Sequence, residues 1–464
     1  MAQKKAAGKE YEIVVIGGGP GGYVAAIKAA QMGKSAALVE REFVGGTCLN
    51  VGCIPTKALL RSVEALKEVR DCAAYGVTGV TAASARLDMK AVQKRKNAIV
   101  GQLTNGVKGL LRANGVDVYD GEGVLKDPHT IAVGKETIKA DNVIIATGSE
   151  TKYLSIPTDP RMKVLSSREM LDITKIPAAV TVIGGGVIGI EFASFLAGAG
   201  SDVTVVEFLD RILPMIDGEI GALAAKRLEK DGIKLHTSAK VVEIKKDAVV
   251  FEKDGKENSV KADMVLMAVG RVPNLSGIDV RALGIETDKD AILTDNTLRT
   301  SVDNIYAIGD VNGKYMLAHT ASEEGIVAVN NICGITSCMD YSNIPSAVYI
   351  QPEIASAGLT EEEAEKQFGS VHVGRFPMIA SGKAKVEGDD SGLVKVIAEA
   401  RFGEIVGVHM YCPHATEMIA ESVLGMRLEC TAEEVADACH PHPSISEAVQ
   451  EAMRAAGGKA IHFL

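Results

Sequence analysis

The chain has 464 residues, of which 47% are hydrophobic and 24% charged, and its formal net charge is −10. This length suggests about three domains of ordinary size with an ample core. The acidic balance argues against a nucleic-acid partner, no uncharged apolar run reaches the ~18 residues of a membrane span, and eight cysteines are too few for a secreted disulfide framework. The first ten residues are polar and lack a signal peptide, so we expect a cytoplasmic protein.

Residues 11–40 have the pattern of a dinucleotide-binding unit. A mostly apolar, β-branched strand is followed by Gly17, Gly19 and Gly22 in G-x-G-x-x-G register, then by a small-residue helix and a strand that ends in Glu40. The glycines let the backbone approach a pyrophosphate at the helix N-terminus, and the acid can accept hydrogen bonds from a ribose.

The same pattern recurs with Gly184, Gly186, Gly189 and Glu207, with the same offset between the first glycine and the acid. Two complete units predict two dinucleotides, and glycine turns that serve only tight packing are a much weaker reading. Because the carboxylate of Glu207 would repel the 2′-phosphate of NADP, the second unit is expected to bind NAD. The nearby Arg211 leaves that preference open.

Three shorter apolar strands end in glycine turns. They lie in 142–149 and 264–274, which follow the first and second units, and in 304–311, which ends in Gly309 and Asp310. Asp310 suits hydrogen bonding to a sugar-like chain, but the local pattern equally favours an Asp that caps the next turn.

The stretch GGTCLNVGCIPTKALL holds Cys48 and Cys53 between a glycine turn and an apolar helix pattern. A zinc site needs four ligands, and Cys333 and Cys338 repeat the spacing without the glycine turn, so no metal is expected. Buried structural thiols are harder to dismiss. The position near a helix N-terminus, beside the first dinucleotide, lowers a thiol pKa and favours a redox disulfide.

A redox disulfide beside NAD needs a group that couples two chemistries. NAD moves hydride, whereas a dithiol gives up two electrons by thiolate attack, and a flavin can couple the two. The first dinucleotide is therefore interpreted as FAD. Thiol exchange also needs a base, and His440 and His442 lie between prolines before a helix that contains Glu447. The local sequence alone fits a pair of ordinary surface histidines as well as it fits an acid–base histidine.

These motifs, in this order, resemble the flavoprotein disulfide reductases (class I pyridine nucleotide-disulfide oxidoreductases), and most closely their lipoamide branch. The resemblance covers the chain from about residue 10 onward. It departs from the branch at Thr56, where Ser is usual, and at Thr320 in MLAHTASEEG, where Lys is usual and the local charge should change.

The resemblance implies the roles of the reactive groups. Cys48 is the interchange thiol that attacks the substrate disulfide, and Cys53 is the thiolate that lies against the flavin. His442, oriented by Glu447, is the acid–base group, which in this family comes from the other subunit of a homodimer. Lys57 is expected near the flavin, paired with a carboxylate.

The resemblance also implies the residues that bind the two cofactors. FAD is expected to contact Gly17, Gly19, Gly22, Glu40, Gly46, Thr47, Lys57, Gly123, Thr147, Gly148, Asp310 and Ala318. The NAD side is expected to use Gly184, Gly186, Gly189, Glu191, Glu207 and Gly270, with Glu191 paired to Lys57.

The expected fold class is α/β, with two Rossmann-like dinucleotide-binding domains and a C-terminal α+β dimerisation domain. We expect an FAD domain over 1–149, an NAD domain over 150–272, a central segment over 273–343 that completes the FAD domain, and a dimerisation domain over 344–464.

The expected activity is oxidation of protein-bound dihydrolipoamide to lipoamide, with reduction of NAD+ to NADH. Such an enzyme would serve a 2-oxo acid dehydrogenase or glycine cleavage system, whose lipoyl-carrying domain would be its partner. Two alternatives are an NAD(P)H-dependent reductase of another disulfide and a structural flavoprotein subunit.

Overall fold

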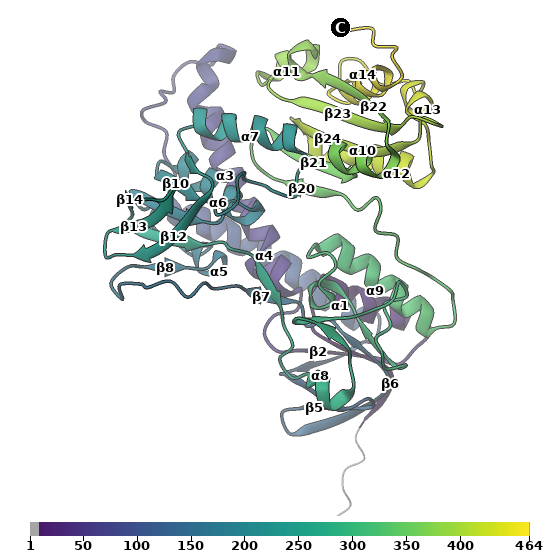
Figure 1. The fold of residues 1–464 in the computed structure, drawn as a ribbon. Coiled ribbons are helices and arrows are strands. Elements are labelled where there is room, and N and C mark those ends of the chain that lie inside the picture. Colours follow the sequence, from purple (N-terminus) through teal and green to yellow (C-terminus); the bar gives the residue numbers. More distant parts are fainter. Residues whose placement is uncertain (1–8, 464) are drawn as a thin grey trace, which may run out of the picture.

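The computed structural model describes residues 9–463 and contains three sheet-based units (Figure 1). The polar segment 1–8, on which the expectation of no signal peptide partly rests, lies outside the described residues. None of the helices among residues 9–463 is both long and apolar enough to cross a membrane.

The first unit is a seven-stranded sheet. Six strands follow the order β3-β2-β1-β6-β5-β4, and the seventh, β19, pairs with β6. Its strands are β1 (Glu10–Ile16), β2 (Ala36–Glu40), β3 (Asp117–Asp120), β4 (Gly123–Asp127), β5 (Thr130–Val133), β6 (Glu136–Ile145) and β19 (Ile305–Ala307). The central strands β1, β2 and β6 run parallel, and their apolar residues are fully buried on both faces, as a parallel sheet requires.

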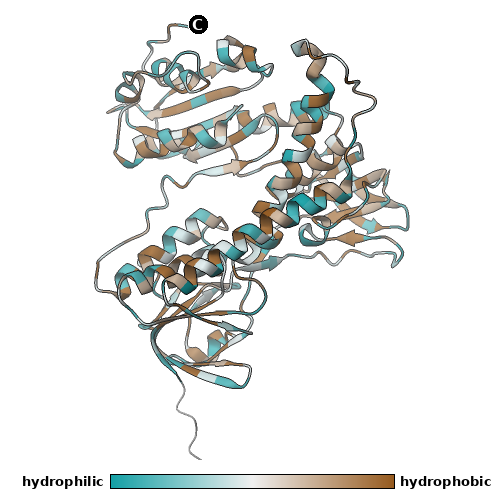
Figure 2. Ribbon diagram, turned by 180° about the vertical axis from the view of Figure 1, so that it is seen from behind, coloured by the Kyte–Doolittle hydropathy of each residue, from teal (hydrophilic) through white to brown (hydrophobic). Residues whose placement is uncertain are grey.

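Helices cover this sheet and extend beyond it. They are α1 (Pro20–Gln31), α2 (Gly46–Val51), α3 (Cys53–Asp71), α4 (Met89–Ala113) and α9 (Ala318–Ile332). Helix α1 lies close to α9 because small residues such as Gly21 and Ala25 face Gly325. Figure 2 shows that the long helices carry both hydrophilic and hydrophobic residues, as expected where one face is buried.

The second unit repeats the plan with a five-stranded parallel sheet of order β11-β10-β9-β15-β8. Its strands are β8 (Val164–Leu165), β9 (Ala179–Ile183), β10 (Asp202–Val206), β11 (Lys234–His236) and β15 (Met264–Met267). Its helices are α5 (Ser167–Met170), α6 (Val187–Ala199) and α7 (Gly218–Lys230). An antiparallel sheet of β12 (Ala239–Ile244), β13 (Ala248–Lys253) and β14 (Lys256–Lys261) adjoins it.

After the second unit the chain returns to the first. Strand β16 (Arg271–Pro273) pairs antiparallel with β7 (Ser149–Thr151), and β19 then joins the first sheet. The short elements α8 (Val280–Leu283), β17 (Thr287–Asp288) and β18 (Ala291–Ile292) lie on the way. Segments far apart in sequence therefore build the first unit together, which Figure 1 shows as purple and green elements side by side.

The C-terminal unit is an antiparallel sheet of order β20-β21-β24-β23-β22. Its strands are β20 (Ser346–Val348), β21 (Glu353–Gly358), β22 (Val371–Pro377), β23 (Leu393–Glu399) and β24 (Ile405–Cys412). Its helices are α10 (Glu361–Phe368), α11 (Gly382–Glu387), α12 (Ala415–Arg427), α13 (Ala432–Ala436) and α14 (Glu447–Ala456). The predicted fold class, two Rossmann-like units and a C-terminal α+β unit, is confirmed.

Candidate active site

The first glycine turn brings several predicted residues to one edge of the first sheet. Gly17 has φ +109°, and a Cβ there would lie 2.1 Å from the Ala146 oxygen, next to Thr147. A Cβ on Gly22 would lie 1.9 Å from the Gly17 oxygen, and one on Gly46 would lie 2.5 Å from the Gly19 Cα. Side chains larger than glycine at these positions would therefore push α1 and α2 away from the turn.

Glu40 holds this turn from the end of β2. Its carboxylate accepts backbone N–H bonds from Gly18 at 2.6 Å, Glu42 at 2.7 Å and Phe43 at 3.1 Å. Gly123 begins β4, where a Cβ would lie 2.9 Å from Ile16 Cγ2, at the end of β1. Carboxylate, glycine turn and strand ends thus meet at the carboxyl edge of the sheet, where ligands bind in open α/β folds.

The second turn repeats this geometry. Gly184 has φ +106°, and a Cβ on Gly189 would lie 2.1 Å from the Gly184 oxygen. Glu207, which is buried, accepts the backbone N–H of Gly185 and that of Leu209. A positive φ of +101° at Gly270 turns the chain after β15. The two units are therefore alike in backbone as well as in sequence.

Both turns leave open space on their outer side. A Cβ built on Gly148, Gly186 or Gly270 meets no heavy atom within 4 Å, and one on Gly19 meets only a Gly46 Cα at 4.0 Å. Each turn also opens a helix of twelve residues or more, so backbone N–H groups and the helix dipole face that space. The residues present fit two dinucleotides.

Cys48 and Cys53 lie beside the first turn as free thiols. Cys48 is in α2 and half-buried, and Cys53 is the first residue of α3 and exposed. The sequence pattern predicts the helix from about residue 56. It begins three residues earlier because Pro55 falls in the first turn, where no N–H partner is needed.

The two sulfurs share one proton unequally. A hydrogen bond from the Cys48 thiol lowers the pKa of Cys53 to about 7, with further help from the Lys57 ammonium. The Glu191 carboxylate acts against this shift, and so does partial shielding of the sulfur by surrounding atoms, although the residue as a whole is exposed. The same hydrogen bond, followed by burial, raises the pKa of Cys48 far above its usual value. In the dithiol state the thiolate is therefore favoured at Cys53 over Cys48.

Lys57 reaches from α3 to α6. Its Nζ donates to both carboxylate oxygens of Glu191, at 2.9 and 2.8 Å, and Glu191 is buried. Glu191 Oε1 also accepts the backbone N–H of Tyr349 at 3.0 Å, and the Lys57 Nζ lies 4.4 Å from the centre of the Tyr349 ring. The sequence reasoning missed Tyr349, which belongs to an apolar run at the start of the C-terminal unit and carries no motif of its own.

Asp310 lies in a short turn after β19, and its side chain hydrogen-bonds to Ser149 rather than capping that turn. Its carboxylate accepts the hydroxyl of Ser149, and Arg271 Nε lies 3.9 Å from Asp310 Oδ2. Arg271 also donates to the Ser149 hydroxyl and carbonyl, both at 2.6 Å. Burial lowers the pKa of Arg271, while the charges of Asp310 and Cys53 counteract this shift. Arg271 was assigned no role from sequence, although it directly follows the glycine turn at Gly270.

Helix α9 begins at Ala318 and carries a third residue that the sequence did not predict. Glu324 is fully buried and accepts the backbone N–H of Gly309 at 2.5 Å, the side-chain amide of Asn312 and the hydroxyl of Tyr341 at 2.7 Å. It thereby fixes the turn that holds Asp310. Thr320, in the position where Lys is usual, is also fully buried, and its hydroxyl has no hydrogen-bond partner among residues 9–463.

His442 and Glu447 form a pair in the C-terminal unit. His442 Nδ1 lies 2.9 Å from Glu447 Oε1, and the imidazole is 79% exposed, so its Nε2 is available to an outside group. Neither cysteine forms a hydrogen bond with His442 among the described residues. His440 differs from the surface histidine that the local pattern allows, because its side chain is 5% exposed and lies 2.9 Å from Glu421.

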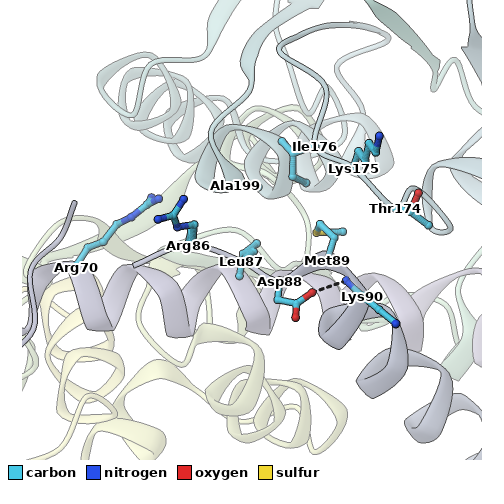
Figure 3. Close-up of a pocket in the computed structure, with 10 residues that line it drawn as sticks. All are labelled: Arg70, Arg86, Leu87, Asp88, Met89, Lys90, Thr174, Lys175, Ile176 and Ala199. Carbon is cyan, nitrogen blue, oxygen red and sulfur yellow. Dashed lines mark hydrogen bonds between the residues drawn. The ribbon is translucent and has the colours of Figure 1, made fainter. Parts of the chain in front are cut away.

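Two further observations concern metal ligands and a surface pocket away from this site. No group of three or more metal-ligating side chains occurs among residues 9–463. A surface pocket of about 500 Å³ (Figure 3) has Arg70 and Arg86 pointing toward one another near the last turn of α3. Because α3 rises 1.5 Å per residue, this pocket is roughly 25 Å from Cys53.

Comparisons with known proteins agree with this geometry. The family model described as pyridine nucleotide-disulphide oxidoreductase matches residues 11–325, and that of its dimerisation domain matches 344–453. A protein named dihydrolipoyl dehydrogenase from Bacillus subtilis (strain 168) is 42% identical over 98% of this chain and 99% of its own length. Dihydrolipoyl dehydrogenase 2, mitochondrial, from Arabidopsis thaliana is 41% identical over 97% of this chain and 91% of its own length.

A solved structure is also similar along nearly the whole chain. The HOCl-induced flavoprotein disulfide reductase from Escherichia coli has a TM-score of 0.85 and 28% identity, and the match covers 96% of this chain and 99% of that one. Both the sequence matches and the fold extend through the glycine turns, the cysteine pair and the C-terminal unit. The chain therefore belongs to the pyridine nucleotide-disulphide oxidoreductase family.

Proposed function

We propose that this protein is a dihydrolipoyl dehydrogenase, which oxidises dihydrolipoamide to lipoamide and reduces NAD+ to NADH. The observation that carries the proposal is the pair of free thiols Cys48 and Cys53 beside the first glycine turn, with the Lys57–Glu191 ion pair near Cys53. The full-length relatives named dihydrolipoyl dehydrogenase, at 41–42% identity, support this substrate over another disulfide.

FAD is the cofactor of the first unit, and NAD binds to the second. FAD supplies the two-electron chemistry that links a dithiol to hydride acceptance by NAD+. We propose that Glu40, Asp310 and the first glycine turn hold FAD, and that Gly46, Thr47, Gly123, Thr147, Gly148 and Ala318 line its path. Lys57 would lie at its flavin end.

The second nucleotide is NAD rather than NADP. The Glu207 carboxylate would repel a 2′-phosphate, and its own hydrogen bonds to the turn fix its position. Arg211, which the sequence leaves as a candidate phosphate partner, donates to the Pro214 carbonyl at 2.9 Å. Its guanidinium is thus already engaged.

The thiols carry the substrate chemistry. His442 takes a proton from one thiol of dihydrolipoamide, and the resulting thiolate attacks Cys48 of the Cys48–Cys53 disulfide. The S–S bond breaks and Cys53 leaves as a thiolate, which its low pKa favours. The second substrate thiol then attacks the substrate sulfur of the mixed disulfide, and its proton passes to Cys48 as that sulfur leaves. Lipoamide is released, and the enzyme keeps the two electrons as the Cys48 thiol and the Cys53 thiolate, with the first proton on His442.

The active site is shared between two subunits. The C-terminal unit belongs to the dimerisation domain of the family, and we propose a homodimer in which His442 of one chain serves the cysteines of the other. The exposed imidazole, oriented by Glu447, supports this arrangement. We also propose the division into domains at 1–149, 150–272, 273–343 and 344–464, a lipoyl-carrying domain of a multienzyme complex as the partner, and a cytoplasmic location.

The test is formation of NADH from free dihydrolipoamide by the purified holoenzyme. Turnover with NAD+, but not with NADP+, is expected. If the enzyme instead oxidised NADH or NADPH with glutathione disulfide and ignored dihydrolipoamide, the family would stand and the proposed substrate would be wrong.

Replacing the interchange thiol isolates its role. The variant Cys48→Ser should bind FAD normally and lose lipoamide turnover, because Ser cannot form the mixed disulfide. Near-native turnover in this variant, measured at equal FAD content, would refute the role of Cys48. The exposed thiol Cys338, which lies outside the site, is the matched control: Cys338→Ser should keep full turnover.

A further inference from the structure

Tyr349 of the C-terminal unit contacts both members of the Lys57–Glu191 pair. It lies between β20 and β21, and its neighbours Val348 and Ile350 are 0% and 2% exposed. Those neighbours pack into the same hydrophobic cluster as Leu59 of α3 and residues of α6. The backbone at Tyr349 is therefore fixed relative to both helices that carry the ion pair.

Two separate contacts join Tyr349 to this pair. Its backbone N–H donates to Glu191 Oε1 at 3.0 Å, and the face of its ring lies 4.4 Å from Lys57 Nζ. A cation at this distance is attracted by the negative face of the ring, more strongly when the site is shielded from water. Tyr349 is half-buried, so partial shielding applies.

We propose that Tyr349 is a positioning residue of the redox centre: its amide fixes Glu191 and its ring covers the Lys57 ammonium, so that the lysine charge stays directed at Cys53. Without the ring, water would solvate the ammonium and screen its field, and the side chain would move more freely. The proposal rests on the proposed redox role of Cys53, but it is independent of which disulfide the enzyme uses.

The effect of the Tyr349 ring on the pKa of Cys53 depends on the charged groups around the thiolate. Those that face Cys53 are Cys48 from α2, Lys57 from α3, Glu191 from α6 and Arg271 from β16. Tyr349 itself also faces Glu353 and Glu417. Both positive charges favour the thiolate and Glu191 opposes it. Weakening Lys57 alone should therefore raise the thiolate pKa while Arg271 keeps part of the effect.

The experiment uses the two-electron-reduced holoenzyme, in which a Cys53 thiolate against oxidised FAD gives a charge-transfer absorption band. The pH midpoint of that band is measured for the native protein, Tyr349→Phe and Tyr349→Leu. We expect Phe to match the native midpoint because the ring remains. Leu should raise the midpoint by about half a pH unit.

A second series guards against loss of folding in the Leu variant. Phenylalanines carrying one to four ring fluorines at position 349 keep the ring's shape and weaken its negative face, so the midpoint should rise with fluorine number. The control is Tyr153→Leu, at a 61% exposed tyrosine whose ring contacts no cation among the described residues. It should leave the midpoint unchanged.

A Leu midpoint equal to the native one, a Phe midpoint shifted as far as that of Leu, or a flat fluorine series would each overturn the proposal. Failure of the proposed function is distinguishable, because it would appear as absent dihydrolipoamide turnover in the native protein. The charge-transfer titration would remain intact in that case.

Discussion

At the residue scale, two histidines two positions apart have different surroundings. His442 is exposed and hydrogen-bonded to Glu447, whereas His440 is buried against Glu421. A carboxylate that holds one imidazole nitrogen leaves the other free to exchange protons, as an acid–base group requires. The local sequence offers both residues as candidates, the family resemblance selects His442, and the surroundings of the two side chains differ in the same sense.

This difference makes a paired prediction. His442→Gln should slow dihydrolipoamide turnover by roughly 10²–10⁴-fold, the usual range for a lost general acid–base group. His440→Gln should chiefly lower thermal stability, because a buried contact to Glu421 is lost. Steady-state rates and melting temperatures of both variants are the measurement, and a reversed pattern would assign proton transfer to His440.

At the element scale, each nucleotide site depends on its own glycine turn, so a substitution in one turn should affect only one site. Gly189→Ala places a methyl group 2.1 Å from the Gly184 oxygen, so α6 must move away from its turn. We expect the variant to lose NADH binding while it retains FAD, because the first unit keeps its own turn. Flavin content and NADH titration measure the two effects separately.

The matched control is a glycine in an exposed helix. Gly106 lies within α4, and a Cβ there meets nothing within 4 Å. Gly106→Ala should leave both cofactors bound and stabilise the helix by about 1 kcal/mol, because alanine loses less backbone entropy on folding. Equal loss of FAD and NADH in Gly189→Ala would contradict the independence of the two units.

The same elements explain how much the sequence could predict. Strand β1 ends directly before Gly17, β2 ends at Glu40 and β10 ends one residue before Glu207, because glycines and acids mark these ends in the sequence. The cysteines also lie beside the first turn as expected. Tyr349, Arg271 and Glu324 could not be identified, because each acts on residues brought close only by the fold. Tyr349, for example, contacts Glu191, 158 positions away.

At the scale of the whole molecule, a buried cluster of charges joins the second unit to the C-terminal unit. Lys395 of β23 is 2% exposed and lies 2.9 Å from Asp217, which caps α7. Its Nζ also lies 3.1 Å from Glu219 and 2.7 Å from Glu361. Arg375 contacts the same two glutamates. No local sequence pattern links these positions, yet they fix how the two units dock.

Removing Lys395 should therefore weaken the whole molecule. Lys395→Met leaves the Asp217 carboxylate buried without its partner, and breaking such a pair costs about 3–5 kcal/mol. The midpoint of urea unfolding, followed by far-UV circular dichroism of the holoenzyme, should fall clearly. The control Lys234→Met removes an exposed pair with Asp202 and should change stability by about 0–1 kcal/mol.

The pH dependence of this cluster has a definite sign. Burial alone would raise the pKa of Asp217, but the hydrogen bond from Lys395 and nearby positive charge hold it below its usual value. A carboxyl group whose pKa is lower in the folded than in the unfolded protein stabilises the folded protein at neutral pH. That stabilisation is lost as the pH falls from the ordinary pKa of the group through its lower pKa in the folded protein. Lys395→Met should therefore lose less stability than the native protein on acidification.

The double variant Lys395→Met/Asp217→Asn should recover part of the loss at pH 7, because it removes the unpaired buried charge and keeps the cap. Additive losses would mean that the two groups do not interact.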